Sequence, residues 1–379
     1  MSAFSLGAEQ RDLVREVREI AERDLLPLAS SGDDGRVNRP LLVALGSHGL
    51  LRRLFGADGR AAAALDLCLL RETLASVCTE AETALALQAL GSYPFVLYGN
   101  EPAIARYRAG VVDGSVVASF ALSEDEAGSD AAALQLRAEP DGDGWRLHGE
   151  KAWISNAPEA DVYTVFARTT ADARARGVTA FVVAGDAPGL SGMRLDMLSP
   201  HPIGRLVFDG VPVSRADVIG EVDAGFTVAM RTLDVLRPSV GAFAVGMAQA
   251  ALDAAVAHTT TRRAFGGVLA EQQAVSHLLA EMATRVEAAR LLVYAAAASY
   301  DAGEPVTRKA AMAKLFATES AQYVVDAAVQ LHGARALQRG HLLAHLYRDV
   351  RAPRIYEGAS EVQRTIIGRS LIKEARTDV

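Results

Sequence analysis

The spacing of apolar residues changes twice along the 379-residue chain, and this change constrains the fold more than any other feature. From residue 9 to residue 114, apolar side chains recur every three or four positions, which predicts amphipathic helices. Between residues 115 and 209, short runs rich in Val, Phe, Tyr and Trp alternate with turn residues, which predicts strands. The helical spacing returns from residue 225. We therefore expect an α+β chain.

Three domains follow from this pattern, with boundaries at residues 1–114, 115–222 and 223–379. The first is predicted to be helical, with helices over residues 9–28, 41–51, 61–77, 79–90 and 99–114, where Pro27 ends the first helix and residues 91–94 break the fourth. The second is predicted to be a compact β-barrel or sandwich, with strands over residues 115–123, 133–138, 145–151, 162–169, 178–184 and 206–209. A hairpin turn at residues 141–144 would use a positive φ at Gly144. The third is predicted to be an antiparallel four-helix bundle over residues 225–261, 271–301, 305–333 and 340–350.

Composition excludes several classes of protein. The net charge of −7 argues against a general binder of nucleic acid or anionic membrane, although residues 335–373 carry eight Lys and Arg against three acids and could face phosphates. Cys68 and Cys78, expected about 15 Å apart on one helix, cannot pair with each other. No metal-type Cys/His spacing occurs, so we expect no metal site and a reducing cytoplasm. No apolar run is long enough to span a membrane.

One segment near the C-terminus favours acid–base chemistry. Residues 354–364 read RIYEGASEVQR, in which Gly358 permits a sharp turn and Ser360 can cap a helix over residues 361–371. Glu357 then lies at a chain reversal beside the aromatic Tyr356. A carboxylate held there can be partly desolvated, which raises its pKa toward that of a useful general base. The alternative is an ordinary solvated loop glutamate.

Two further motifs lie in the β region. The loop FALSEDEAGSD, residues 120–130, offers backbone N–H groups that could hold a flavin edge and a pyrophosphate. The run KAWISN, residues 151–156, offers the flat face of Trp153 and, on the same side of a regular strand, the Ser155 hydroxyl. Taken alone, Trp153 could equally be a core residue.

Together these motifs resemble the acyl-CoA dehydrogenase family, and the resemblance covers the whole chain. It implies an oxidoreductase that uses FAD to dehydrogenate an acyl thioester, with Glu357 as the base. The alternative base position of some family members is occupied here by Leu236. The implied cofactor-binding residues are Leu122, Ser123, Gly128, Ser129, Trp153, Ser155, Arg262, Phe265, Gln273, Gln330, Gly333 and Glu361. The implied substrate-binding residues are Ser129, Asp234, Arg237, Tyr356 and Gly358, although Arg237 could equally pair with Asp234.

The sequence also departs from the family pattern. Asp125 and Glu126 replace the usual Pro-Gly, Ala359 replaces a threonine, and residues 302–305 contain an acid where a base often holds the adenine of coenzyme A. The added negative charge leaves two carriers open for the acyl group, coenzyme A and an acyl carrier protein. The resemblance further implies a homodimer or homotetramer and an electron-transferring flavoprotein as acceptor. A flavin oxidase or monooxygenase that uses oxygen, and a flavin-containing nucleic-acid binder, are the alternatives.

Overall fold

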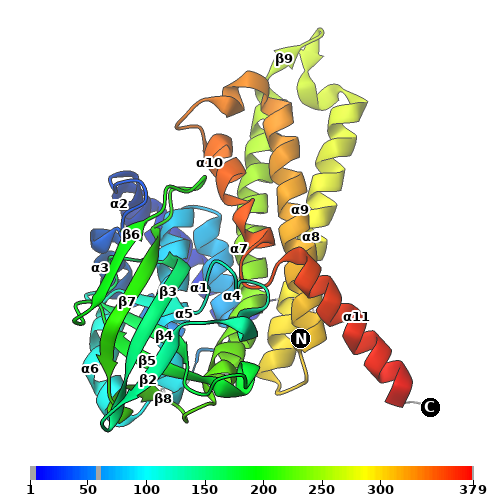
Figure 1. Ribbon diagram of the computed structural model, residues 1–379. Coiled ribbons are helices and arrows are strands. Elements are labelled where there is room, and N and C mark those ends of the chain that lie inside the picture. The colour runs from blue at the N-terminus through cyan, green and yellow to red at the C-terminus, as the bar shows by residue number, and fades with distance from the viewer. Residues whose placement is uncertain (1–5, 57–60, 378–379) are drawn as a thin grey trace. The chain divides into compact units, whose positions relative to one another are not determined.

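The structure is a computed structural model that describes residues 6–56 and 61–377 (Figure 1). These residues pack into two compact units. The first contains the described parts of Met1–Glu22, Ala63–Thr79 and Asp234–Val379, and the second contains those of Arg23–Ala62 and Glu80–Leu233. The predicted helical N-terminal region is therefore divided between the units. The predicted boundaries at residues 114 and 222 stay a prediction.

The first unit is helical. Its helices are α1 (Ala8–Ile20), α4 (Ala64–Ala75), α8 (Gln273–Asp301), α9 (Thr307–His332), α10 (Leu342–Asp349), α11 (Ser360–Thr377) and the part of α7 (Gly225–Thr261) that begins at Asp234. It also holds the short hairpin β9 (Arg263–Ala264) and β10 (Gly267–Val268), and the 3₁₀ turns Leu269–Glu271, Gly333–Leu337 and Ala352–Arg354. The three long helices and α10 correspond to the predicted bundle.

Alanine dominates where these helices meet. Ala289, Ala296 and Ala297 of α8 and Ala313 and Ala317 of α9 are all buried in one apolar cluster. Small side chains let helix axes approach closely, because little volume separates the backbones. The helix α7 is long and apolar enough to cross a membrane by length and composition, but 61% of its most apolar window is buried within the protein. We read it as a core helix.

The second unit combines a sheet with helices. Its helices are α2 (Leu26–Ser30), α3 (Arg39–Ser47), α5 (Thr79–Tyr98), which begins at the end of the first unit, and α6 (Glu101–Asp113). Its strands are β1 (Ala118–Ala121), β2 (Arg137–Asp141), β3 (Gly144–Ser155), β4 (Val162–Arg168), β5 (Val178–Ala184), β6 (Leu190–Arg194), β7 (Ile203–Val213) and β8 (Val218–Ile219). They form one sheet in the order β6-β7-β3-β2-β4-β5-β8, with β1 parallel to β4. The 3₁₀ turns are Arg52–Leu54, Ala131–Ala133, Arg174–Gly177 and Arg215–Asp217. The π-helix Ala21–Leu25, which begins at the end of the first unit's N-terminal segment, precedes α2.

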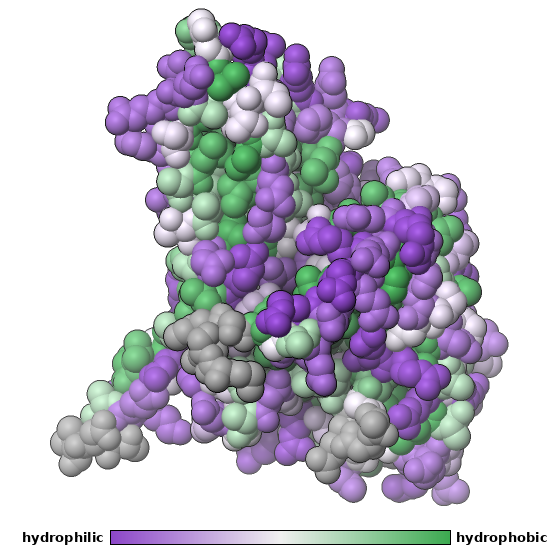
Figure 2. Space-filling view, turned by 180° about the vertical axis from the view of Figure 1, so that it is seen from behind, coloured by the Kyte–Doolittle hydropathy of each residue, from purple (hydrophilic) through white to green (hydrophobic). Residues whose placement is uncertain are grey.

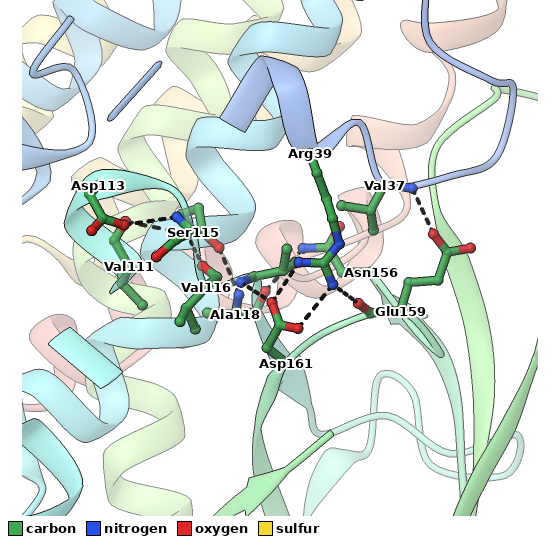
Figure 3. A network of polar contacts seen from close by, with 12 residues as sticks. Val37, Arg39, Val111, Asp113, Ser115, Val116, Ala118, Asn156, Glu159 and Asp161 are labelled. Atoms are coloured by element: carbon green, nitrogen blue, oxygen red, sulfur yellow. Dashed lines mark hydrogen bonds and ion pairs between the residues drawn. The ribbon is translucent and has the colours of Figure 1, made fainter. Parts of the chain in front are cut away.

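A polar network fixes the start of β1 (Figure 3). The Asp161 carboxylate accepts hydrogen bonds from the Arg39 guanidinium at 2.8 and 3.0 Å and from the Val117 backbone N–H at 2.8 Å. The Asn156 amide donates to the Ala118 carbonyl at 3.0 Å. These bonds hold β1 against the turn that follows β3. The network therefore positions both segments that carry the candidate flavin motifs.

Two predicted helix breaks were wrong. Pro27 lies in the first turn of α2, where its missing N–H is not needed, so helical structure continues to Ser30. The helix α5 continues through Pro94, although residues 91–94 were predicted to end it. Gly91 serves close packing there, since an added Cβ would lie 2.4 Å from the Ser119 nitrogen. Tertiary packing overrides the local turn signal.

Smaller predictions also need correction. The hairpin at residues 141–144 is present, but its positive φ of 58° is at Gly142 and not at Gly144. Cys78 lies between α4 and α5, so it does not share a helix with Cys68. The strands β6 and β8 were not predicted, because β6 is mostly exposed and β8 has two residues. Short or exposed strands carry little apolar periodicity.

Candidate functional site

The segment that carries Glu357 has an unusual backbone. Glu357 has φ of 50° and Gly358 has φ of 92°, so two consecutive residues are left-handed. Glycine adopts this conformation freely, but a residue with a Cβ does so at a cost. The chain enters from the 3₁₀ turn Ala352–Arg354 and leaves into α11 at Ser360. The predicted chain reversal is confirmed, and it extends to Glu357 itself.

Two buried side chains hold this reversal. The Lys314 ammonium group on α9 donates to the Tyr356 carbonyl at 3.1 Å and to the Gly358 carbonyl at 2.8 Å. The Gln363 amide on α11 donates to the Gly358 carbonyl at 2.9 Å. Both side chains are fully buried. Outside the reversal, Glu319 accepts from the Ser360 hydroxyl at 2.7 Å and pairs with Arg354 at 2.9 Å.

The Glu357 carboxyl lies in a low-dielectric environment. Its residue keeps some exposure, but Oε2 is buried and has no hydrogen-bond partner among the described residues. Burial raises the pKa of Glu357 above its ordinary value of 4.5, and the charges of Arg71, Lys314 and Arg237 act in the opposite direction. Burial is the larger effect. A carboxyl with these properties is suited to accept a proton from a substrate.

The two arginines near Glu357 are held in place by other groups. Arg71 on α4 donates to the Ser239 hydroxyl at 2.6 Å, and Arg237 on α7 pairs with Asp234 at 2.6 Å. The ion pair that the sequence left open is therefore present. Because Arg237 is buried while the Asp234 side chain stays 41% exposed, the pair extends from the protein interior to solvent.

Trp153 lies on a break in β3. The pairing of β3 with β7 shifts between Lys151 and Ile154, and Trp153 has φ of 62°. A bulge of this kind turns one side chain out of the regular alternation. Accordingly Lys151 is fully buried, whereas Trp153 is 49% exposed. The prediction placed Trp153 and Ser155 on the same side of a regular strand. It was wrong to assume a regular strand, because β3 is irregular here. The exposed indole still presents a flat apolar face.

The loop after β1 is tied to β3. Lys151 donates to the Leu122 carbonyl at 2.8 Å and pairs with the buried Glu124 at 2.8 Å, while the Ala152 N–H donates to the Ser123 carbonyl at 3.0 Å. Burial lowers the pKa of Lys151 to about 8, with Glu124 opposing the change. The exposed end of the loop carries Gly128 and Ser129. The structure thus brings Leu122 and Ser123 next to the strand of Trp153.

The charge of the unusual Asp125 is compensated. Asp125 pairs with Arg205 of β7, with a second bond of 2.9 Å, and the Arg205 guanidinium lies 5.9 Å from the centre of the Trp153 ring. The acid at residue 304 is likewise paired, since Glu304 lies 2.8 Å from Lys309. The excess negative charge expected from these two acids is therefore reduced by neighbouring bases.

A second cluster occupies one end of the bundle. Arg262 follows α7 and Gly333 follows α9, and the two helix ends meet through His258 and His332, whose rings stack 4.2 Å apart. Burial lowers the pKa of His258, and the charges of His332, Arg335 and Arg262 lower it further. Sequence reasoning did not find these histidines, because no metal-type spacing marks them. Gln273 and Gln330 are exposed.

Phe265 is an unusual residue of the hairpin β9–β10. It has φ of 54°, Gly266 has φ of 87°, and the Phe265 side chain is 91% exposed. Both positive φ values fit a two-residue hairpin turn, in which a bulky residue is disfavoured. Glu361, also a predicted cofactor residue, is exposed on α11 and contacts Arg364.

Three family models match the chain in order. They are the N-terminal, middle and C-terminal domains of acyl-CoA dehydrogenase, over residues 7–115, 119–211 and 223–372. The chain belongs to the acyl-CoA dehydrogenase family. Members of this family are FAD-dependent, and the homologues and structural neighbours indicate an oxidoreductase that dehydrogenates acyl-CoA. The recognised family, the fold and the class of enzyme predicted from the sequence are confirmed.

Individual relatives agree with this assignment. The probable acyl-CoA dehydrogenase FadE25 of Mycobacterium tuberculosis H37Rv is 38% identical, over 98% of this chain and 97% of its own. The butyryl-CoA dehydrogenase structure from Megasphaera elsdenii is 33% identical, with a TM-score of 0.91 over 97% of this chain and 99% of its own. A structure of PigA with FAD and proline is 26% identical, with a TM-score of 0.91 over 97% of this chain and 98% of its own.

The residues present fit a flavin of this family. Trp153 presents an exposed flat face on a bulge. An added Cβ at Gly128 would meet nothing within 4 Å, so the backbone is accessible there.

Sequence reasoning missed Lys314, Arg71 and Lys151. For Lys314 a signal existed, because it interrupts the apolar face formed by Ala310, Ala317 and Ala321 at helical spacing.

We predict that Glu357→Gln stabilises the fold at neutral pH. Folding raises the pKa of the Glu357 carboxyl. Above about pH 4.5, Glu357 therefore loses its proton more readily in the unfolded chain than in the folded one, and its ionisation favours unfolding. Glutamine never ionises and removes this cost. The midpoint of thermal unfolding of Glu357→Gln should be higher than that of the wild type at pH 7 to 8. The difference should vanish below about pH 4.5, where the glutamate of the wild type is as neutral as the glutamine. A lower midpoint at pH 7 would contradict the desolvation of Glu357.

Proposed function

We propose that this protein dehydrogenates an acyl-CoA with bound FAD, using Glu357 as the base that removes the α proton. The observation that carries the proposal is the buried Oε2 of Glu357, which has no hydrogen-bond partner within residues 6–56 and 61–377. Its backbone is left-handed, and three cations lie nearby. The family match supplies the class of reaction.

The chain's own groups would then divide the work. Glu357 accepts the α proton, which the thioester carbonyl makes acidic, and its raised pKa makes it a stronger base than a solvated glutamate. FAD, when bound, accepts the hydride from the β carbon. Trp153, Ser155, Leu122 and Ser123 would hold the flavin ring region.

Coenzyme A is the carrier that the structure favours. The argument for an acyl carrier protein rested on Asp125 and Glu126 and on the lack of a base in residues 302–305. Asp125 is paired with Arg205 and Glu304 with Lys309, which weakens that argument. An electron-transferring flavoprotein is the acceptor that the family resemblance suggests, while oxygen remains the acceptor to be tested against it. The hypothesis of nucleic-acid binding loses support, because two arginines of the basic segment 335–373, Arg354 and Arg364, lie beside Glu319.

The Glu357→Gln variant should keep FAD and lose flavin reduction by acyl-CoA at least about a hundredfold, the usual size of a general-base effect. Anaerobic stopped-flow absorbance measures this rate. As a control, Glu139→Gln changes an exposed glutamate on β2 that pairs with Arg137, and it should reduce the flavin at the normal rate. Normal reduction in Glu357→Gln would move the base elsewhere.

The carrier can be decided with one short acyl chain offered on coenzyme A and on an acyl carrier protein. We expect a higher kcat/KM for the coenzyme A form, because two of the acids that would repel its phosphates, Asp125 and Glu304, are paired with bases. Anaerobic flavin reduction over a range of substrate concentrations gives kcat/KM for each of the two acyl carriers. A higher kcat/KM for the carrier-protein form would overturn this choice.

We also propose a homo-oligomer whose contacts support flavin binding. Figure 2 shows apolar side chains on the surface of the bundle, and the exposed apolar residues there include Val256, Leu291 and Met312. Phe265 adds an exposed aromatic at the hairpin. Apolar surface of this kind is typical of contacts between subunits.

If a neighbouring subunit's flavin is bound by Arg262, cofactor content and assembly should fall together in Arg262→Ala. Absorbance gives FAD per chain, and sedimentation velocity gives the oligomeric state. Arg263→Ala, one position along and also exposed, is the matched control and should change neither. A monomeric wild-type protein with full flavin occupancy would contradict the linkage.

A further inference from the structure

Lys314 is a buried cation to which the proposed function gives no role. It is fully buried on α9, on the face that also carries the buried Ala310, Ala317 and Ala321. An apolar side chain would pack at this position without any desolvation cost, whereas a lysine must lose its hydration. Burial lowers the pKa of Lys314 to about 8, with the charge of Glu357 opposing the change. A cation kept under these conditions requires compensating contacts.

Those contacts lie on both sides of Glu357. The Lys314 Nζ atom donates to the carbonyl of the residue before Glu357, Tyr356, and to the carbonyl of the residue after it, Gly358. The Glu357 backbone between them is left-handed, a conformation that is disfavoured for a residue with a Cβ. Two charge-assisted hydrogen bonds are strong enough to offset such a cost. Lys314 therefore fixes the backbone from which the Glu357 side chain projects.

The charged groups around this pair come from four helices. Glu357 is near Arg71 of α4, Arg237 of α7 and Lys314 of α9. Lys314 is in turn influenced by Glu357, by Arg237, by Glu319 of its own helix and by Glu361 of α11. Arginine stays charged in proteins, whereas a buried lysine can lose its proton. Lys314 is thus the cation near Glu357 whose charge can change with pH.

We propose that Lys314 is a positioning residue for Glu357: its ammonium group fixes the two carbonyls that flank the base, and its positive charge favours the carboxylate form. The base role of Glu357 rests on the proposed function, but the clamp and the charge do not. Removal of the charge should raise the pKa of Glu357, because one of three nearby cations is lost. Removal of the donors should also misplace the carboxyl.

Two variants separate these effects. Lys314→Met removes both charge and donors, whereas Lys314→Gln removes the charge and keeps an N–H donor. We expect the acidic limb of the flavin-reduction profile to move to higher pH in both variants. The plateau rate should fall roughly tenfold to a hundredfold in Lys314→Met, the usual scale for a misplaced catalytic group, and less in Lys314→Gln. Lys373→Met, which changes an exposed lysine on α11, should match the wild type.

A measurement without substrate separates this inference from the proposed function. Infrared difference spectra of the purified protein follow the carbonyl stretch of a protonated carboxyl, and the band absent from Glu357→Gln belongs to Glu357. Its titration should shift to higher pH in Lys314→Met and Lys314→Gln but not in Lys373→Met. An unchanged titration in both variants would overturn the proposal, even if Glu357 proves to be the base. A shifted titration would support it, even if the reaction proves to be different.

The wild-type protein supplies a test that needs no folded variant. Because burial lowers the pKa of Lys314 to about 8, the wild-type rate profile should bend near that pH as the cation loses its proton. Folded Lys314→Met and Lys314→Gln should lack this bend. A wild-type profile without a bend near pH 8 would overturn the charge role.

Discussion

The desolvation of a carboxyl group is the constraint on which the helical unit depends. An ionised carboxylate taken out of water is costly unless opposite charges lie nearby. Here Arg71, Arg237 and Lys314 supply those charges from three different helices. Each is itself buried, so each needs a partner of its own, and these are Ser239, Asp234 and the loop carbonyls. The site is therefore a network in which one buried charge requires the others.

Close helix packing makes this network possible. Alanines of α8 and α9 fill the bundle core, and Gly241 of α7 faces Val293, where an added Cβ would lie 2.7 Å from the Val293 side chain. Small residues bring the helices near enough for side chains from α4, α7 and α9 to converge on one loop. A bulkier core would separate them, because a packed interior has little space to yield.

The sheet unit shows how departures from a family pattern are tolerated. Asp125 stands where the family has proline, yet Arg205 pairs with it and lies near Trp153. Its neighbour Glu124 is buried against Lys151 and helps to hold the loop after β1. Two adjacent acids thus have different roles, one at an exposed ion pair and one in the interior. A count of charges from the sequence alone therefore overestimated the negative charge of this loop.

The sequence by itself determined the order of helical and β segments, the chain reversal at Glu357 and the motif residues around Trp153, because periodicity, turn residues and short motifs are local signals. Only the tertiary structure decided which cations face Glu357, since Arg71 and Lys314 lie 286 and 43 residues away along the chain. It also decided that α5 continues through Pro94, that a bulge exposes Trp153, and that Asp125 is neutralised. These outcomes depend on long-range packing and on burial, which no local pattern encodes.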